Sequence, residues 1–156
     1  MSDNRRRFLK RSALIGAYSV AATAGLAAPK HSLAQWLTQN FTQGELDETL
    51  ERLYTGMEIL ESDEIELKLP RIAENGAVVP ITVSTSLTDV ASIAILVEKN
   101  PVPLAATFKL SPLVEPIVSA RLKMAETCDV IAIVKAGNTL YSNRQKVKVT
   151  IGGCGG

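Results

Sequence analysis

The chain has 156 residues, of which 46% are apolar and 21% are charged, and its formal net charge is +1. This length and composition are typical of one globular domain and unlike a polytopic membrane protein, in which charged residues are rare. The first 34 residues hold six of the 17 basic residues and one of the 16 acidic residues. The remainder therefore has a net charge of −4, which argues against a basic nucleic-acid-binding surface.

The first 34 residues have the three parts of an export signal. A basic cluster is followed by an apolar run over 13–28 and by a small-x-small step that ends at Ala34. The run is rich in alanine and glycine, so it makes a poor transmembrane span, and we expect no membrane anchor. Part of the basic cluster resembles a twin-arginine export signal, in Arg5, Arg6, Phe8, Leu9 and Lys10. We therefore predict that residues 1–34 are a twin-arginine signal peptide and that the mature protein is periplasmic.

Residues 35–60 are predicted to form a linker and a short amphipathic helix over 43–56. Thr42 and Glu45 make a capping-box pattern that predicts the helix start, and Gly56 is a plausible stop. Four apolar residues lie on one face at helical spacing: Leu46, Leu50, Leu53 and Met57. We expect this face to pack against the rest of the domain.

From residue 61 onward the apolar residues repeat with a period of two, which indicates β-strands. Seven short strands at roughly ten-residue spacing predict an all-β sandwich over 61–151. Asn75-Gly76 and Gly137-Asn138 are turn signals, and Pro80 argues for an edge position or a bulge. The predicted strands are 64–70, 77–85, 90–99, 105–111, 117–125, 128–136 and 140–151.

The usual catalytic sets are missing from the predicted mature chain. Its only histidine, His31, lies in the predicted signal, so no imidazole remains to activate a serine or cysteine nucleophile or to bind zinc or copper. An acidic cluster lacks the loop spacing of a calcium site, and we expect it to be a solvated face: Glu58, Glu61, Asp63, Glu64 and Glu66. We therefore expect no bound cofactor or metal.

The two cysteines lie in very different sequence contexts. Cys128 begins an apolar strand, where a free cysteine usually behaves as a small buried hydrophobe. A partner contact and a disulfide are the alternatives for it. Cys154 lies near the end of the chain in a glycine-rich stretch that we expect to be a flexible arm, formed with Gly152, Gly153, Gly155 and Gly156.

The ordinary uses of a thiol do not fit Cys154. A structural disulfide needs two α-carbons held within about 7 Å, lipidation motifs place the cysteine elsewhere, and a metal needs several ligands. Transfer of a covalently held group does fit, because an extended chain reaches about 3.3–3.6 Å per residue and glycine can enter a narrow channel. No arginine or helix start lies beside Cys154 in sequence to activate the thiol. The pattern therefore favours a carrier over an enzyme.

Several stretches together resemble the SoxY family, the sulfur-carrier subunits of the bacterial thiosulfate-oxidising Sox system. They are the twin-arginine signal, "LPRIAENGAVVPITV", "EKNPVP" and the terminal "VKVTIGGCGG". The resemblance implies an immunoglobulin-like sandwich that forms a heterodimer with SoxZ. It also implies that Cys154 is the site of covalent sulfur attachment and that residues 152–156 are the carrier arm.

The same resemblance implies a cycle of enzymes that act on Cys154. The c-type cytochrome SoxAX joins thiosulfate to the cysteine as a thiosulfonate, and the manganese hydrolase SoxB releases sulfate. The remaining persulfide sulfur is oxidised by a sulfane dehydrogenase or handed on. One alternative is a secreted sandwich module that only binds partners and has an incidental terminal thiol. Another is a ubiquitin-like carrier that uses the terminal Gly-Gly carboxyl, against which export and the position of Cys154 argue.

Overall fold

The computed structural model of the protein describes residues 40–151. The chain separates into two compact units, 1–35 and 36–156, and every described residue belongs to the second. The predicted signal peptide and the predicted arm lie outside the described residues. Their boundaries, at 34 and 152, therefore stay predictions.

All seven predicted strands are present. They are β2 (Ile65–Lys68), β4 (Val79–Thr85), β5 (Val90–Val97), β6 (Leu104–Lys109), β7 (Ile117–Leu122), β8 (Cys128–Ala136) and β9 (Thr139–Val149). Helix α2 (Leu46–Tyr54) precedes them. Two further strands, β1 (Ile59–Glu61) and β3 (Ile72–Ala73), were not predicted, because three or two residues are too few to show a period of two.

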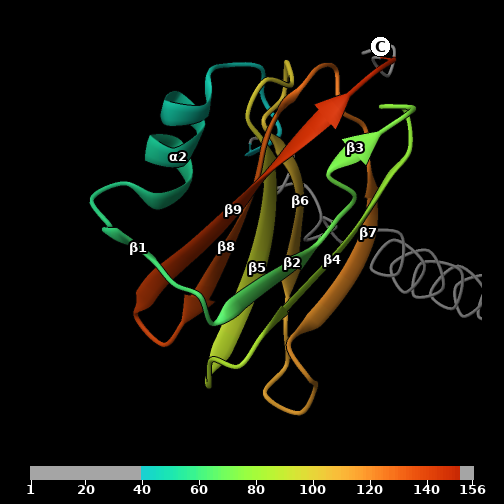
Figure 1. The fold of residues 1–156 in the computed structure, drawn as a ribbon. Coiled ribbons are helices and arrows are strands. Elements are labelled where there is room, and N and C mark those ends of the chain that lie inside the picture. Colours follow the sequence, from blue (N-terminus) through green and yellow to red (C-terminus); the bar gives the residue numbers. More distant parts are fainter. Residues whose placement is uncertain (1–39, 152–156) are drawn as a thin grey trace, which may run out of the picture. The chain divides into compact units, whose positions relative to one another are not determined.

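The strands form two sheets that pack face to face (Figure 1). The larger sheet has the order β1-β9-β8-β5-β6, with β3 also paired to β9, and the smaller has the order β2-β4-β7. Neighbouring strands are antiparallel except for β1 and β3, which both run parallel to β9. This arrangement confirms the all-β, immunoglobulin-like sandwich.

The interior between the sheets is built from the inward-facing residues of both. In β4, for example, Val79, Ile81 and Val83 are buried, whereas Pro80 between them is exposed. At one margin, side-chain amides of β9 reach the backbone of the smaller sheet. Asn143 donates to the carbonyl of Ile65 at 2.6 Å and Gln145 donates to the carbonyl of Leu69 at 3.1 Å. These bonds satisfy polar groups where the apolar interior ends.

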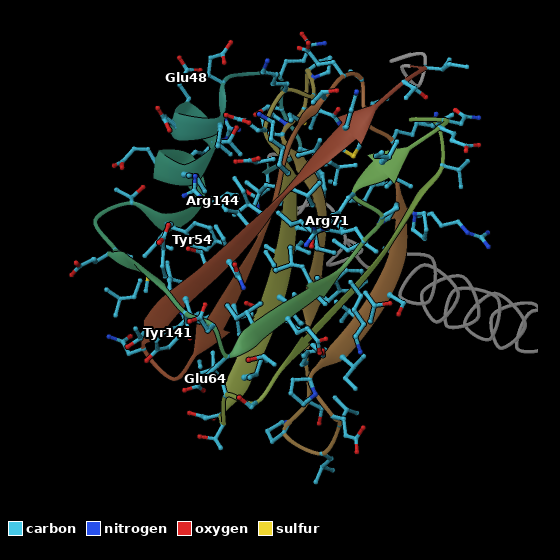
Figure 2. The ribbon with its side chains drawn as sticks, in the orientation of Figure 1. Glu48, Tyr54, Glu64, Arg71, Tyr141 and Arg144 are labelled. Carbon is cyan, nitrogen blue, oxygen red and sulfur yellow. The ribbon has the colours of Figure 1, made fainter. Side chains whose placement is uncertain are left out.

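Helix α2 packs on the outer face of the larger sheet. Its predicted apolar face makes a second core with residues of β5, β6, β8 and β9, and Tyr54 and Ile59 join the four predicted residues. Burial raises the pKa of Tyr54, which is labelled in Figure 2, to about 12. The helix also explains the continuous apolar runs of β5 and β8: both faces of these central strands are covered.

The predicted start of the helix is wrong. The capping-box pattern placed the start at Thr42, but the helix begins at Leu46, and its N-cap Glu45 makes no side-chain capping bond. The preceding backbone has another partner, because the N–H of Gly44 donates to the carbonyl of Pro101 at 3.2 Å. Tertiary contact with the 101 loop therefore displaced the local capping signal. The stop at Gly56 is confirmed, with a φ of 70° there.

The three turn and edge predictions are confirmed. Gly137, with a φ of 56°, turns the chain between β8 and β9 as predicted. Pro80 lies in a central strand, but pairing with β2 stops at Thr82, so Pro80 has a neighbour only in β7. It is therefore locally at an edge. Asn75-Gly76 also begins a turn as predicted: the N–H of Val78 donates to the carbonyl of Asn75 at 3.4 Å, and the N–H of Ala77 donates to the side-chain oxygen of Asn75 at 2.8 Å. This turn does not close a hairpin, because β3 pairs with β9 rather than with β4.

Candidate functional site

The last strand leads directly to the predicted carrier arm. Antiparallel pairing of β9 with β8 runs from Thr139, opposite Ala136, to Val147, opposite Cys128 (Figure 1). The described chain continues to Ile151. Cys154 and the glycines of the predicted arm lie outside the described residues, so the structure describes only the chain that precedes the predicted arm.

One side of the end of β9 contacts Thr127. Because β8 begins at Cys128, Val149 has no partner in that strand. The hydroxyl of Thr127 takes this place: it accepts a hydrogen bond from the N–H of Val149 at 2.9 Å and lies 3.3 Å from the carbonyl of Val149, to which it donates. A hydroxyl has both a donor and acceptors, so one side chain can satisfy both groups of a backbone residue.

The other side of the end of β9 contacts the segment 71–76. The N–H of Lys148 donates to the carbonyl of Arg71 at 2.9 Å, and the N–H of Thr150 donates to the carbonyl of Ala73 at 3.1 Å. The hydroxyl of Thr150 also donates to the carbonyl of Glu74 at 3.0 Å. Further along, the N–H of Gly76 donates to the carbonyl of Ile151 at 2.8 Å. Backbone bonds therefore hold the chain up to Ile151.

Cys128 is a core residue, as the sequence predicted. Its side chain is only 2% exposed, belongs to the cluster between the sheets, and forms no disulfide. Burial raises the pKa of its thiol above the ordinary value of 9.0. The carboxylates of Glu98, Asp129 and Glu126 act in the same direction, whereas a hydrogen bond from the backbone of Lys99 acts against it. A thiol in this environment stays protonated and is a poor nucleophile at neutral pH.

The raised pKa of Cys128 predicts a loss of stability in alkali. The unfolded chain releases this proton near pH 9.0 while the folded chain retains it, so the free energy of unfolding should fall as the pH rises above about 9. The loss should be at most about 1.4 kcal/mol for each pH unit. Urea titrations of the wild-type protein and of Cys128→Ala would measure it. Equal pH slopes for the two proteins above pH 9 would contradict the prediction.

The acidic cluster forms a solvated face, as the sequence predicted. All five of its carboxylate residues are exposed. The carboxylate of Glu61 lies 3.6 Å from the guanidinium of Arg144, and the carboxylate of Glu66 lies 3.5 Å from the ammonium of Lys68. Within residues 40–151, no group of three or more histidine, cysteine, aspartate or glutamate side chains is placed to hold a metal ion.

A depression of about 580 Å³ lies over one end of the smaller sheet. Its lining combines carboxylates with hydroxyls and two apolar residues: Asp63, Glu64, Glu66, Ser84, Thr85, Ser86, Glu115, Pro116 and Ile117. The only histidine of the chain is His31, so none of these hydroxyls has an imidazole base beside it within the described residues. The described lining of the depression therefore contains no serine–histidine pair.

Comparison with known proteins identifies the family. A family model described as sulfur oxidation protein SoxY matches residues 50–154, about two thirds of the chain. The chain belongs to the SoxY family. Its fold is similar to the structure of the sulfur carrier protein SoxY from Chlorobium limicola f thiosulfatophilum, with 41% sequence identity and a TM-score of 0.63. That alignment covers 69% of this chain and 97% of the other.

A more distant structural match shows only the shared fold. Superoxide reductase (neelaredoxin) from Ignicoccus hospitalis aligns with a TM-score of 0.53 at 18% identity, over 58% of this chain and 94% of that chain. A search among curated proteins found no match. Within the described residues, no helix is long and apolar enough to cross a membrane.

Membership of the SoxY family gives the chain a sulfur-carrier role in sulfur oxidation. The SoxY match ends at Cys154 and includes Cys128, Thr127 and the segment 71–76. Analysis of the sequence did not identify Thr127 or 71–76 as parts of a site. The stretch "LPRIAENG" that resembles the family contains 71–76 and was the only available signal. Thr127 shows none, because an isolated threonine before a strand is common.

Proposed function

We propose that Cys154 is the residue to which sulfur is covalently attached and that residues 152–156 form the arm that presents it. The observation that supports this choice most directly is the burial of the other cysteine. Cys128 is 2% exposed and its pKa is raised, so it does not supply the thiolate that sulfur transfer requires. Cys154 is the remaining cysteine, and the family match extends to it.

In the proposed loading step, the Cys154 thiolate and thiosulfate together lose two electrons to a c-type cytochrome partner. A bond forms between the cysteine sulfur and the outer sulfur of thiosulfate. Hydrolysis then breaks the bond between this outer sulfur and the sulfonate sulfur. Water supplies the oxygen, sulfate and two protons leave, and a persulfide remains on Cys154. The carrier supplies only the thiol, and its partners supply the redox centre and the hydrolytic site.

The location and partners of the protein belong to the same proposal. The twin-arginine pattern at Arg5 and Arg6 supports export of the folded protein to the periplasm. The resemblance to SoxY supports a heterodimer with SoxZ and transient visits to SoxAX, SoxB and a sulfane dehydrogenase. A short arm suits such visits, because glycine has no side chain to exclude it from the narrow channels of several enzymes.

Mass analysis tests the proposal on the wild-type protein. The exported chain, purified with its partner subunit, would be incubated with thiosulfate and the c-type cytochrome complex. We expect one thiosulfate-derived adduct per chain, and peptide mapping should locate it on Cys154 and not on Cys128. Treatment with a thiol reductant should remove the adduct, since a disulfide-like bond holds it. An adduct on Cys128, or none at all, would contradict the proposal.

A further inference from the structure

Residues 148–151 are held from both sides although they lie beyond the last β8–β9 residue pair. That pair is Cys128 with Val147. After it, Thr127 binds the backbone of Val149 on one side, and the segment 71–76 binds Lys148, Thr150 and Ile151 on the other. A strand that has lost its neighbour would ordinarily fray. Here the side chain of Thr127 takes the place of β8, and the segment 71–76, which contains β3, holds the other side of the strand end.

The two groups that hold this end are themselves fixed to the domain. The carbonyl of Gly76 accepts a hydrogen bond from the N–H of Met124 at 2.7 Å, and Met124 is fully buried. Ala73, also buried, belongs to the interior cluster between the sheets. Thr127 directly precedes Cys128, which is fixed in the same cluster. Thr127 and the segment 71–76 are therefore both held by the core, and through them the chain is restrained up to residue 151.

We propose that Thr127, together with 71–76, is a positioning element that sets the length and the origin of the carrier arm. This inference rests on the proposed function of Cys154. In this role Thr127 and the segment act on the strand end and not on the sulfur: they hold residues 148–151 against the domain. The arm that a partner enzyme must order is then limited to residues 152–156, and it always leaves the domain at the same point.

The physical reason is conformational entropy. Fixing the backbone of one residue costs about 1–2 kcal/mol. If the support at Val149 were lost, up to three further residues would join the segment that each enzyme has to order on every visit. This cost applies equally to the bound ground state and to the transition state, so it should raise KM and leave kcat unchanged. A rise of about fivefold to thirtyfold corresponds to the ordering of one further residue.

The decisive variant is Thr127→Val, which keeps the shape of the side chain and removes its hydroxyl. Thr127→Ser retains the hydroxyl and should restore wild-type behaviour. Thr82→Val is the matched control, because Thr82 also makes a side-chain hydrogen bond, to Ser119 at 2.8 Å, but lies in the smaller sheet. Insertion of two glycines between Ile151 and Gly152 lengthens the arm without altering Thr127, so it tests arm length even if Thr127→Val is unstable.

Two measurements would be made on the mature chain purified with its SoxZ partner. Amide hydrogen exchange at Val149 and Thr150 reports whether the strand end is released, and it requires no loading. Steady-state loading of thiosulfate by the c-type cytochrome complex gives KM and kcat for the carrier. Alkylation of Cys154 by iodoacetamide should be equally fast in every variant, because a small reagent does not need the arm to be ordered.

We expect Thr127→Val to exchange faster at Val149 and to show a KM raised at least about fivefold with an unchanged kcat. The glycine insertion should raise KM in the same way. Unchanged protection at Val149, or lost protection with an unchanged KM, would overturn the inference. If the wild-type protein is not loaded on Cys154 at all, the proposed function fails instead, and the exchange data still decide whether Thr127 holds the strand end.

Discussion

Replacing Cys154 with serine is expected to abolish loading of thiosulfate onto the carrier. A serine hydroxyl does not ionise near neutral pH and cannot form the sulfur–sulfur bond that holds the cargo. The loss should be complete, in contrast to the partial effects of variants that only change how the arm is ordered. Intact-mass analysis after incubation with thiosulfate and the c-type cytochrome complex measures it directly.

The matched control removes the other thiol. Cys128→Ala should still be loaded to one adduct per chain, because Cys128 is buried between the sheets and its thiol is held protonated. The circular dichroism spectrum of Cys154→Ser should equal that of the wild type, since the substitution replaces one sulfur atom by oxygen and changes none of the residues 40–151 that form the sandwich. Loading of Cys154→Ser at the wild-type rate would exclude Cys154 as the attachment site and would favour a module that only binds partners.

Ile95→Ala is expected to cause a large loss of stability. Ile95 is fully buried in β5 and faces the interior between the sheets. Its paired neighbours are Ala132 in β8 and Ala106 in β6, so its side chain fills space that these small residues leave. Truncation should leave a cavity and lower the free energy of unfolding by about 2–5 kcal/mol.

Urea denaturation would measure this loss against a matched substitution. Ile117→Ala removes the same atoms from a strand residue that is 52% exposed, so its effect should be smaller than about 1 kcal/mol. The m-values of both variants should equal that of the wild type if the native and unfolded states keep their compactness. Equal destabilisation by the two substitutions would show that the interior around Ile95 collapses to fill the cavity.

The strands and the apolar face of the helix were predicted from the spacing of apolar residues. This spacing is regular because one side of a helix, or every second residue of a strand, is buried. Leu46, Leu50, Leu53 and Met57 recur at helical spacing, and all four contact the larger sheet. In β4, alternate residues face the interior, which is the pattern that a strand covered on one side must have. These features could be predicted because each is set by neighbours within a few residues along the chain.

Other features could not be predicted, because their partners lie far away in the sequence. The capping signal at Thr42 was overridden by a bond from Gly44 to the backbone of Pro101. The turn at Asn75-Gly76 is present, but the sequence did not show that the strand before it pairs with β9, more than seventy residues later. Local patterns describe what a short peptide prefers, and long-range hydrogen bonds decide which segments pair.

The sandwich class, the amphipathic helix, the burial of Cys128 and the choice of Cys154 as the candidate carrier thiol could all be predicted from the amino-acid sequence. They follow from composition, from periodicity and from the absence of histidine after residue 31. How the end of β9 is held, in contrast, depends on the folded chain. Thr127 and the segment 71–76 are far apart in sequence, and they reach the end of β9 from opposite sides only because the sheets bring them there. Hydrogen bonds between distant segments leave no local pattern in the sequence, so they are visible only in the folded structure.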